Sequence, residues 1–308
     1  MESVLRSRSH LHEYREGQNP LMRANYFKLT DGRRLCWAEY GDPAGQPVFL
    51  FHGNPGSRLA WGAMPGSPFI PGVRLVAPDR PGYGRTDFSR RALERWPQDM
   101  AELADHLGID RFAVFGPSGG APYALACAWK IPDRLTCAGV FGAVGPNEAD
   151  AVEGVQRSLK LLWRIAGPLQ WAIRLQMWLI SLAARRNPVW LVRKMRDLEL
   201  HDEDKAALDR PEILDLFRVD FPEAYRQNGI GSAYDATIPA KWPIPLGEVT
   251  TRVKLWHAER DPLVGNMTRY LAGELAHAEL RVLPGEGHLW ILDHMPEVLE
   301  ALMEPHPR

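Results

Sequence analysis

The sequence has little of three features that would each define a class of protein: cysteine, charge of one sign and long apolar runs. Only three cysteines occur in 308 residues, far apart and each inside an apolar run, so a disulfide framework is not expected. The formal net charge of −1 lacks the basic excess of a nucleic-acid-binding protein. The amino terminus lacks the apolar stretch of a secretory signal, which predicts a cytoplasmic protein.

The composition that remains is that of a globular protein, with 45% apolar and 24% charged residues. The length fits one large domain or one domain with an insertion. Residues 151–198 are rich in Trp and Leu, but Arg164 and Arg174 interrupt them too often for the roughly twenty apolar residues of a membrane span. This segment is expected to form amphipathic helices.

Short apolar runs alternate with turn signals and longer helix-like stretches from Asn25 to Pro132, a pattern typical of a layered α/β sheet. The Asp31-Gly32 pair between two strand-like runs predicts a hairpin. Nearly continuous apolar runs, which predict strands covered on both faces, occur at 47–53, 73–79, 111–116 and 135–144.

After Gly145 the period becomes helical, with breaks at Gly167-Pro168 and Asn187-Pro188. Strand-like runs resume near Val249, so the helical block is interpreted as an insertion into the sheet domain. The expected organisation is an amino-terminal extension at 1–24, a first core part at 25–145, the insertion at 146–245 and a second core part at 246–308.

Gly116-Pro117-Ser118-Gly119-Gly120 matches the G-x-S-x-G motif and lies between a strand-like run and a helix-like run. The glycines have a physical reason, because flanking side chains would clash in so tight a strand-to-helix turn. The turn would lift the Ser118 hydroxyl above the sheet and onto the positive end of a helix. Ser118 is therefore the predicted nucleophile.

A serine hydroxyl needs a base within hydrogen-bond reach, and the base needs an orienting acid. Asp261 and His288 each follow a strand-like run, and the order Ser118, Asp261, His288 is that of nucleophile-elbow hydrolases. His257 lies within a strand and is expected to be a hydrogen-bonded structural histidine. The acidic run at 201–204 resembles a metal site but is better explained as the first turn of a helix.

Acyl transfer also needs hydrogen-bond donors for the developing oxyanion. The turn at 52–57 follows a strand and offers the Asn54 N–H, while the helix start beside the nucleophile offers the Gly119 N–H. Asp79 and Arg80 follow the next strand and are expected to have a structural hydrogen-bonding role.

With these residues in place, the chain resembles the α/β-hydrolase family. Five motifs carry the resemblance in the expected order: His52–Ser57, Asp79–Thr86, Gly116–Gly120, Arg260–Pro262 and Gly285–His288. The resemblance implies an eight-stranded, mostly parallel sheet flanked by helices, with a helical cap inserted after the sixth strand. Two positions depart from the family pattern: Pro117 in the elbow, and Ala258 where a glycine is usual before the acid.

The resemblance predicts a serine hydrolase that cleaves a carboxylic ester of a small or medium apolar substrate through an acyl-enzyme, without a metal or cofactor. The same triad would also serve a lactone, thioester, amide or C–C bond, and a non-catalytic ligand-binding protein is a further alternative. Ser118 disfavours haloalkane dehalogenase and epoxide hydrolase activity, which use an aspartate there. Pro117 and Trp290 are expected to line the substrate pocket. The sequence leaves the oligomeric state open.

The near-zero net charge conceals a polarised insertion. Residues 151–198 hold nine basic and two acidic residues, whereas residues 199–235 hold ten acidic and four basic ones. We expect these halves to pair with each other, although a cationic face presented to an anionic substrate or lipid surface is the alternative. The four tryptophans in this region are expected to pack the insertion on the core and line the acyl pocket, rather than to meet a membrane: Trp163, Trp171, Trp178 and Trp190.

Overall fold

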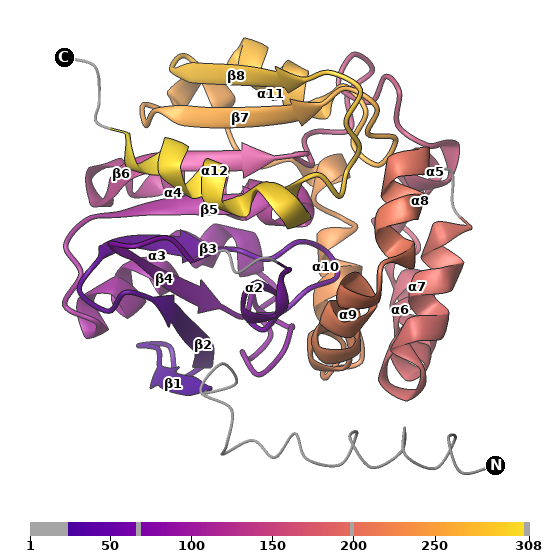
Figure 1. Cartoon of the computed structure of the whole chain (residues 1–308), viewed down its shortest axis with the longest axis horizontal. Helices are drawn as coiled ribbons and strands as arrows, with labels where there is room; N and C mark the ends of the chain where they lie inside the picture. Colours follow the sequence, from indigo (N-terminus) through magenta and orange to yellow (C-terminus); the bar gives the residue numbers. More distant parts are fainter. Residues whose placement is uncertain (1–23, 66–68, 198–199, 305–308) are drawn as a thin grey trace.

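The computed structural model describes residues 24–65, 69–197 and 200–304. The extension expected at 1–24 lies, apart from its last residue, outside this part of the chain. One sheet of eight strands runs through the molecule in the order β1-β2-β4-β3-β5-β6-β7-β8 (Figure 1). The strands are β1 (Asn25–Lys28), β2 (Arg34–Gly41), β3 (Gln46–Leu50), β4 (Val73–Pro78), β5 (Phe112–Pro117), β6 (Leu135–Phe141), β7 (Val253–Ala258) and β8 (Ala278–Leu283).

The expected mostly parallel sheet is confirmed. Only β2 pairs antiparallel with its two neighbours, β1 and β4, and every other pairing is parallel. The predicted hairpin joins β1 to β2, and its Gly32 takes a φ of +89°, which a glycine tolerates at little cost. Parallel strands end at one edge of a sheet, so the loops after β3, β5, β6, β7 and β8 meet there.

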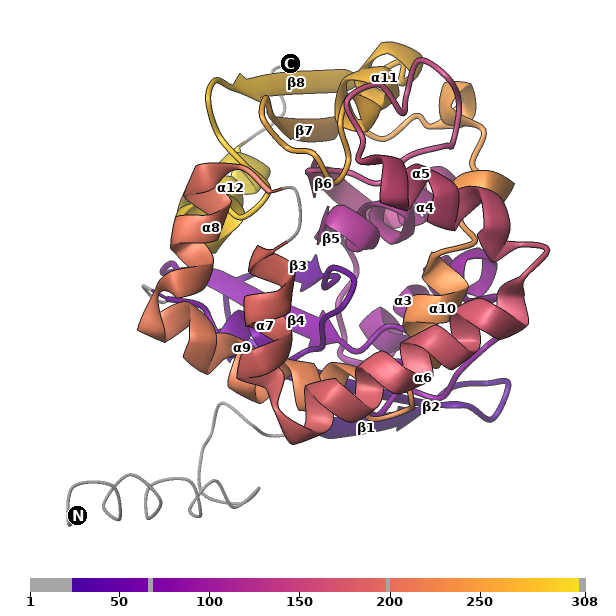
Figure 2. The same ribbon diagram turned by 90° about the vertical axis from the view of Figure 1, so that its right-hand side faces the viewer.

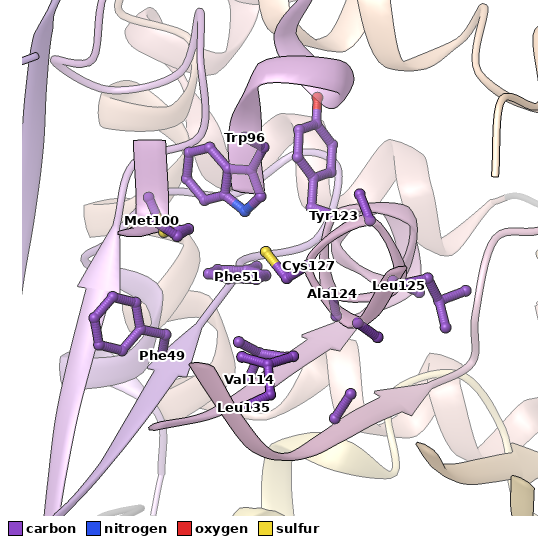
Figure 3. Packing of buried hydrophobic residues seen from close by; sticks show 14 of the residues in the cluster. Phe49, Phe51, Trp96, Met100, Val114, Tyr123, Ala124, Leu125, Cys127 and Leu135 are labelled. Carbon is purple, nitrogen blue, oxygen red and sulfur yellow. The ribbon is translucent and has the colours of Figure 1, made fainter. Parts of the chain in front are cut away.

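Helices cover both faces of the sheet, as continuous apolar strands require. Alternate residues of β3 point to opposite faces of the sheet. Phe49 packs with α3 (Ala92–His106) and α4 (Ala121–Lys130), whereas Val48 and Leu50 pack on the side of α12 (Ile291–Met303). Figure 3 shows the first of these cores, in which Phe49 and Trp96 are fully buried. The two cores hold the strand ends in fixed positions.

In the described residues, six α-helices lie between β6 and β7 and beyond the carboxyl ends of the parallel strands (Figure 1), which confirms the insertion after the sixth strand. They are α5 (Arg157–Ala166), α6 (Gln170–Arg186), α7 (Pro188–Arg196), α8 (Asp202–Asp209), α9 (Pro211–Ala224) and α10 (Ile230–Asp235). The predicted breaks separate α5 from α6 and α6 from α7. The domain boundaries at 146 and 245 stay predictions. Over the described ranges, no helix has the length and apolar character needed to cross a bilayer.

Of the expected pairing between the basic and acidic halves of the insertion, the described residues contain one ion pair, Arg196 with Asp209, and the expectation is otherwise wrong. Four buried acidic residues bond to the core instead: Asp204 to the amides of His288 and Leu289, Asp220 to Ser57, Glu223 to Arg58 and Arg85, and Asp235 to Arg80. Of the nine basic residues at 151–198, only Lys194 and Arg196 have a carboxylate partner within the described residues. The acidic half therefore faces the core, and the basic half faces outward.

The expectation for the tryptophans holds for only one of them. Trp163 is buried in a small apolar cluster with Val155 and Met267. Trp171, Trp178 and Trp190 are exposed, and none of the four lines the cavity described below. The core is filled without these three side chains.

Candidate active site

Ser118 stands between β5 and α4 in a backbone conformation that an L-residue rarely adopts, with a φ of +51°. The neighbouring glycines make this turn possible. A Cβ at Gly116 would lie 2.4 Å from the Gly120 carbonyl oxygen, and a Cβ at Gly120 would lie 2.3 Å from the Phe51 carbonyl oxygen. The turn aims Ser118 into a cavity at the edge where the parallel strands end.

Asp261 and His288 are in direct contact although they follow different strands. His288 Nδ1 lies 2.5 Å from Asp261 Oδ2, and the Leu263 N–H donates to Asp261 Oδ1 at 2.9 Å. Gly142, which follows β6, leaves room for this pair: with a φ of +49°, its Cβ would lie 3.1 Å from Asp261 Oδ2. His288 and Ser118 line the same cavity, so the three predicted triad residues come from three strand ends.

A carboxylate of the insertion holds the loop that carries His288. Asp204 Oδ2 accepts from the His288 N–H at 3.0 Å, and Asp204 Oδ1 accepts from the Leu289 N–H at 2.7 Å. Burial alone lowers the pKa of His288, but the charges of Asp261 and Asp204 outweigh it, so the net shift of this pKa is upward. Asp204 was expected only in an acidic first turn of a helix. Its position four residues before the buried Leu208 was the available, weak signal that it faces inward.

The two predicted oxyanion donors lie next to each other. A Cβ at Gly119 would lie only 3.2 Å from the Asn54 backbone nitrogen, so the two backbone segments are in close contact. The Asn54-Pro55 peptide bond is cis. The N–H of Gly119 belongs to the first turn of a helix, where backbone donors have no partner in the preceding turn. Asn54 and Ser118 both line the cavity, whereas Gly119 is buried beside them, so the oxyanion role of the two N–H groups stays a prediction.

Arg80 ties down the loop that carries Asn54. Its Nε donates to the His52 carbonyl and its Nη2 to the Gly53 carbonyl, both at 2.9 Å, while Nη1 donates to Asp235 at 2.6 Å. His52 Nε2 accepts from the Arg80 N–H at 3.0 Å, so the ring proton lies on Nδ1, which donates to the Gly53 carbonyl. Burial and the Arg80 charge lower the pKa of His52 well below its usual value. The structural role expected of Arg80 agrees with these bonds.

The cavity has a volume of about 190 Å³ and a mainly apolar wall built by core and insertion together. Its wall includes Trp61, Met64, Phe141, Met195, Leu208 and Phe217. Pro117 lies in this wall, as expected. Trp290 does not: it directly precedes α12, is buried, and stacks on Phe141 and on His294 with ring centroids 5.5 and 4.2 Å apart.

One acidic side chain of the insertion also lines the cavity, and the sequence reasoning missed it. Asp220 of α9 accepts from Ser57 Oγ at 2.5 Å, and burial raises the pKa of Asp220 to about 7. The signal was present in the helical period, since Ile213, Phe217, Asp220 and Ala224 share one buried stripe of α9. An acidic residue within an apolar stripe indicates a specific buried role.

The alternative candidates lie away from this cavity. His257 is buried in β7 as expected, but its Nδ1 has no hydrogen-bond partner among the described atoms, so the expectation of a hydrogen-bonded histidine is wrong. Burial lowers the pKa of His257, which keeps the ring neutral. In the described ranges, no three His, Cys, Asp or Glu side chains form a group that could hold a metal ion.

A family model described as "Alpha/beta hydrolase family" matches residues 48–302. The chain is 36% identical over 118 residues to the probable proline iminopeptidase of Streptomyces coelicolor, covering 35% of this chain and 36% of that protein. It is 30% identical over 201 residues to the proline iminopeptidase of Neisseria meningitidis serogroup A, covering 60% and 58%. It is 35% identical over 121 residues to epoxide hydrolase B of Mycobacterium tuberculosis, covering 38% and 33%. The chain thus spans between about a third and three fifths of these curated relatives.

Solved structures show the same fold. An α/β-hydrolase fold protein from Nakamurella multipartita matches with a TM-score of 0.65 at 24% identity, covering 91% of this chain and 98% of the other. A thermophilic esterase from Thermogutta terrifontis matches with a TM-score of 0.64 at 20% identity, covering 91% and 96%.

Proposed function

The chain belongs to the alpha/beta hydrolase family, and from that premise we propose that it is a serine hydrolase that cleaves a carboxylic ester of a small or medium apolar substrate. The observation that carries the proposal is the shared cavity. Ser118 and His288 both line it, and Asp261, which does not line it, bonds to His288 Nδ1. A hydroxyl, an imidazole and a carboxylate in this order are the parts of a nucleophilic triad.

The proposed reaction begins when Ser118 Oγ attacks the ester carbonyl carbon and His288 Nε2 takes the hydroxyl proton. Asp261 stabilises the imidazolium cation that forms. The Asn54 and Gly119 N–H groups donate to the tetrahedral oxyanion. Collapse of the intermediate expels the alcohol, which takes the proton from His288. A water molecule, deprotonated by His288, then attacks the acyl carbon. Ser118 Oγ takes the proton back from His288 as it leaves, which releases the acid and restores the free enzyme.

The cavity wall supports an apolar acyl group. Aliphatic and aromatic side chains dominate it, and burying such a group against them is favourable by about 25 cal/mol per Å² of apolar surface. The cavity volume of about 190 Å³ favours a small or medium group over a long extended one. The serine nucleophile disfavours the epoxide-opening chemistry named for one relative, for which we expect an aspartate at position 118.

A second candidate is the amide of an amino-terminal imino acid, the chemistry named for several relatives. The observation that favours it is Asp220, a carboxyl group on the cavity wall that could pair with a cationic amine. The pKa of about 7 weakens this candidate, because near neutral pH the group is only partly ionised.

A fluorophosphonate probe followed by peptide mapping tests the nucleophile. We expect labelling of Ser118 in the wild type and none in Ser118→Ala. An unlabelled but folded wild-type protein would favour the ligand-binding alternative.

Rates on p-nitrophenyl esters of increasing acyl length, measured beside proline p-nitroanilide, test the substrate class. We expect the highest kcat/KM with short and medium acyl esters. A kcat/KM for proline p-nitroanilide that exceeds those of the esters and falls in Asp220→Asn would replace the ester proposal with the peptidase candidate. Asp215→Asn, on an exposed turn of the same helix, is the matched control.

A further inference from the structure

We propose that the outer face of α6 and α7 binds an anionic lipid surface. The helix α6 crosses the outside of the insertion, and α7 lies beside it (Figure 2). Five large apolar side chains project from these two helices into solvent and form what we call the tryptophan face: Trp171 (69% exposed), Leu175 (50%), Trp178 (43%), Leu179 (54%) and Trp190 (48%).

The tryptophan face is a second apolar stripe and is not needed for packing. The inner side of α6 is already buried through Ile173, Ser181 and Ala184, which turn toward the rest of the insertion. Trp171, Leu175 and Trp178 follow one another at intervals of four and three residues, so they share the outer side of the helix. A soluble protein rarely leaves so large an apolar stripe exposed, and such stripes mark interaction sites.

The charges around this face select an anionic partner. Residues 157–196 contain nine basic residues and no acidic one. Seven of the nine have no carboxylate partner in the described part of the chain, because ion pairs reach only Lys194 and Arg196. Arg174 projects from the same side of α6 as Trp171 and Trp178. Tryptophan interleaved with arginine on one helix face is the composition of helices that lie in the interface of anionic bilayers.

A polar cavity next to the face provides a place for an anionic headgroup. Its volume is about 380 Å³, and its wall includes the basic side chains of Arg90, Arg174 and Lys241. Among the described residues, its wall contains one acidic side chain, Glu94, which already forms an ion pair with Arg91. Three cations around one hollow favour a phosphate group at that position.

Charge complementarity also decides against a second copy of the chain as the occupant. A twofold contact would place this face against itself, with its unpaired basic residues opposite one another. An anionic bilayer offers both an apolar layer for the tryptophans and phosphates for the arginines. We therefore commit to the lipid surface.

Co-sedimentation of the full chain with vesicles tests the proposal. Binding is measured without substrate, so the result does not depend on the proposed ester hydrolysis. We expect binding to vesicles of phosphatidylcholine with 30% phosphatidylglycerol, weak binding to pure phosphatidylcholine, and a loss of binding in high salt. Removing one positive charge near the surface costs roughly fivefold in affinity, so reversing Arg174 and Arg185 to Glu should weaken binding by well over tenfold.

A second variant tests the contribution of the apolar side chains of the tryptophan face. Trp171→Ala with Trp178→Ala should reduce affinity for the anionic vesicles at least about tenfold. Leu280→Ala on β8 and Lys28→Glu on β1 are the matched apolar and basic controls, because both side chains are exposed and lie on the two edge strands of the sheet, outside the insertion. Circular dichroism and thermal melting identify any variant that fails to fold.

Three outcomes would overturn the proposal. One is equal sedimentation with both kinds of vesicle. Another is binding by the tryptophan and arginine variants as strong as that of the two controls. The third is a dimer that the Trp171→Ala, Trp178→Ala variant dissociates in analytical ultracentrifugation, which would assign the face to a second copy.

Discussion

Replacing Asp204 should impair catalysis, although Asp204 does not line the cavity. Asp204 lies on α8 of the insertion. Its two carboxylate oxygens accept from the His288 and Leu289 amides, at 3.0 and 2.7 Å. Asp204→Ala leaves both amides without their partner. Asp204→Asn keeps the size of the side chain and one acceptor oxygen, but it removes the charge.

The magnitude follows from the two bonds. A hydrogen bond to a charged group contributes about 1.5–3 kcal/mol, and water entering beside the loop recovers part of that loss. We expect Asp204→Ala to lower the free energy of unfolding by about 2–4 kcal/mol. If the His288 loop shifts by about 1 Å, kcat/KM falls on the order of a hundredfold.

The charge makes a separate, directional prediction. In the proposed reaction His288 must be neutral to accept the Ser118 proton, so the acid limb of kcat/KM is expected to report the His288 pKa in the free enzyme. The Asp204 charge stabilises the imidazolium cation and raises this pKa. Asp204→Asn should therefore move the acid limb to lower pH, while the maximal kcat falls because the cation formed during reaction is less stabilised.

The assay is a pH–rate profile on a soluble ester for the wild type, Asp204→Asn and Asp202→Asn. Asp202 belongs to the same helical turn, but its side chain is 94% exposed, which makes it the matched control. The reasoning is refuted if the acid limb of Asp204→Asn stays where it is in the wild type, or if Asp202→Asn moves the limb equally.

Three further predictions concern the cavity. Ser118→Ala should reduce turnover by about 10⁴-fold or more at an unchanged melting temperature, as measured by ester hydrolysis and calorimetry. Asp220 has its pKa raised from 3.8 to about 7 in the folded state, so its contribution to stability is present below pH 4 and disappears as pH rises through about 7. Thermal melting should accordingly find that the stability of Asp220→Asn relative to the wild type rises from pH 5 to pH 8, and a constant difference would contradict the shift. Gly142→Ala places a methyl group against Asp261 and should lower kcat/KM at least about tenfold, whereas Gly108→Ala shares the positive φ, meets no neighbour and should affect stability alone.

The fold was predictable because its signals are local. Continuous apolar runs marked the strands, and the breaks at Gly167-Pro168 and Asn187-Pro188 separated the helices that the structure contains. The elbow glycines around Ser118 specify a turn that few other residues allow. Asp261 and His288 each follow a strand, and parallel strands bring their carboxyl ends to one edge. Chain order and turn chemistry therefore sufficed to propose these three residues.

The contacts made across the insertion were not predictable in this way. Asp204 lies on α8 and Asp220 on α9, and nothing in the chain order tells which core group each one meets. Trp290 follows His288 by two residues, yet its ring stacks on Phe141 and does not line the cavity. Such positions depend on how the insertion and the sheet domain pack against each other. Periodicity within one segment does not describe that packing.

The charge pattern of the insertion illustrates the same limit and has a consequence for function. The sequence indicates two segments of opposite charge, and pairing them with each other is the simplest arrangement. The core changes this balance, because Arg58, Arg80 and Arg85 are largely buried there and require carboxylate partners. The acidic half of the insertion supplies Glu223 and Asp235 as these partners. The negative charges of these two residues therefore neutralise core arginines rather than the basic half. The basic half is then left on the outside without enough acidic residues to neutralise it, so the packing that seals the cavity also creates the cationic tryptophan face.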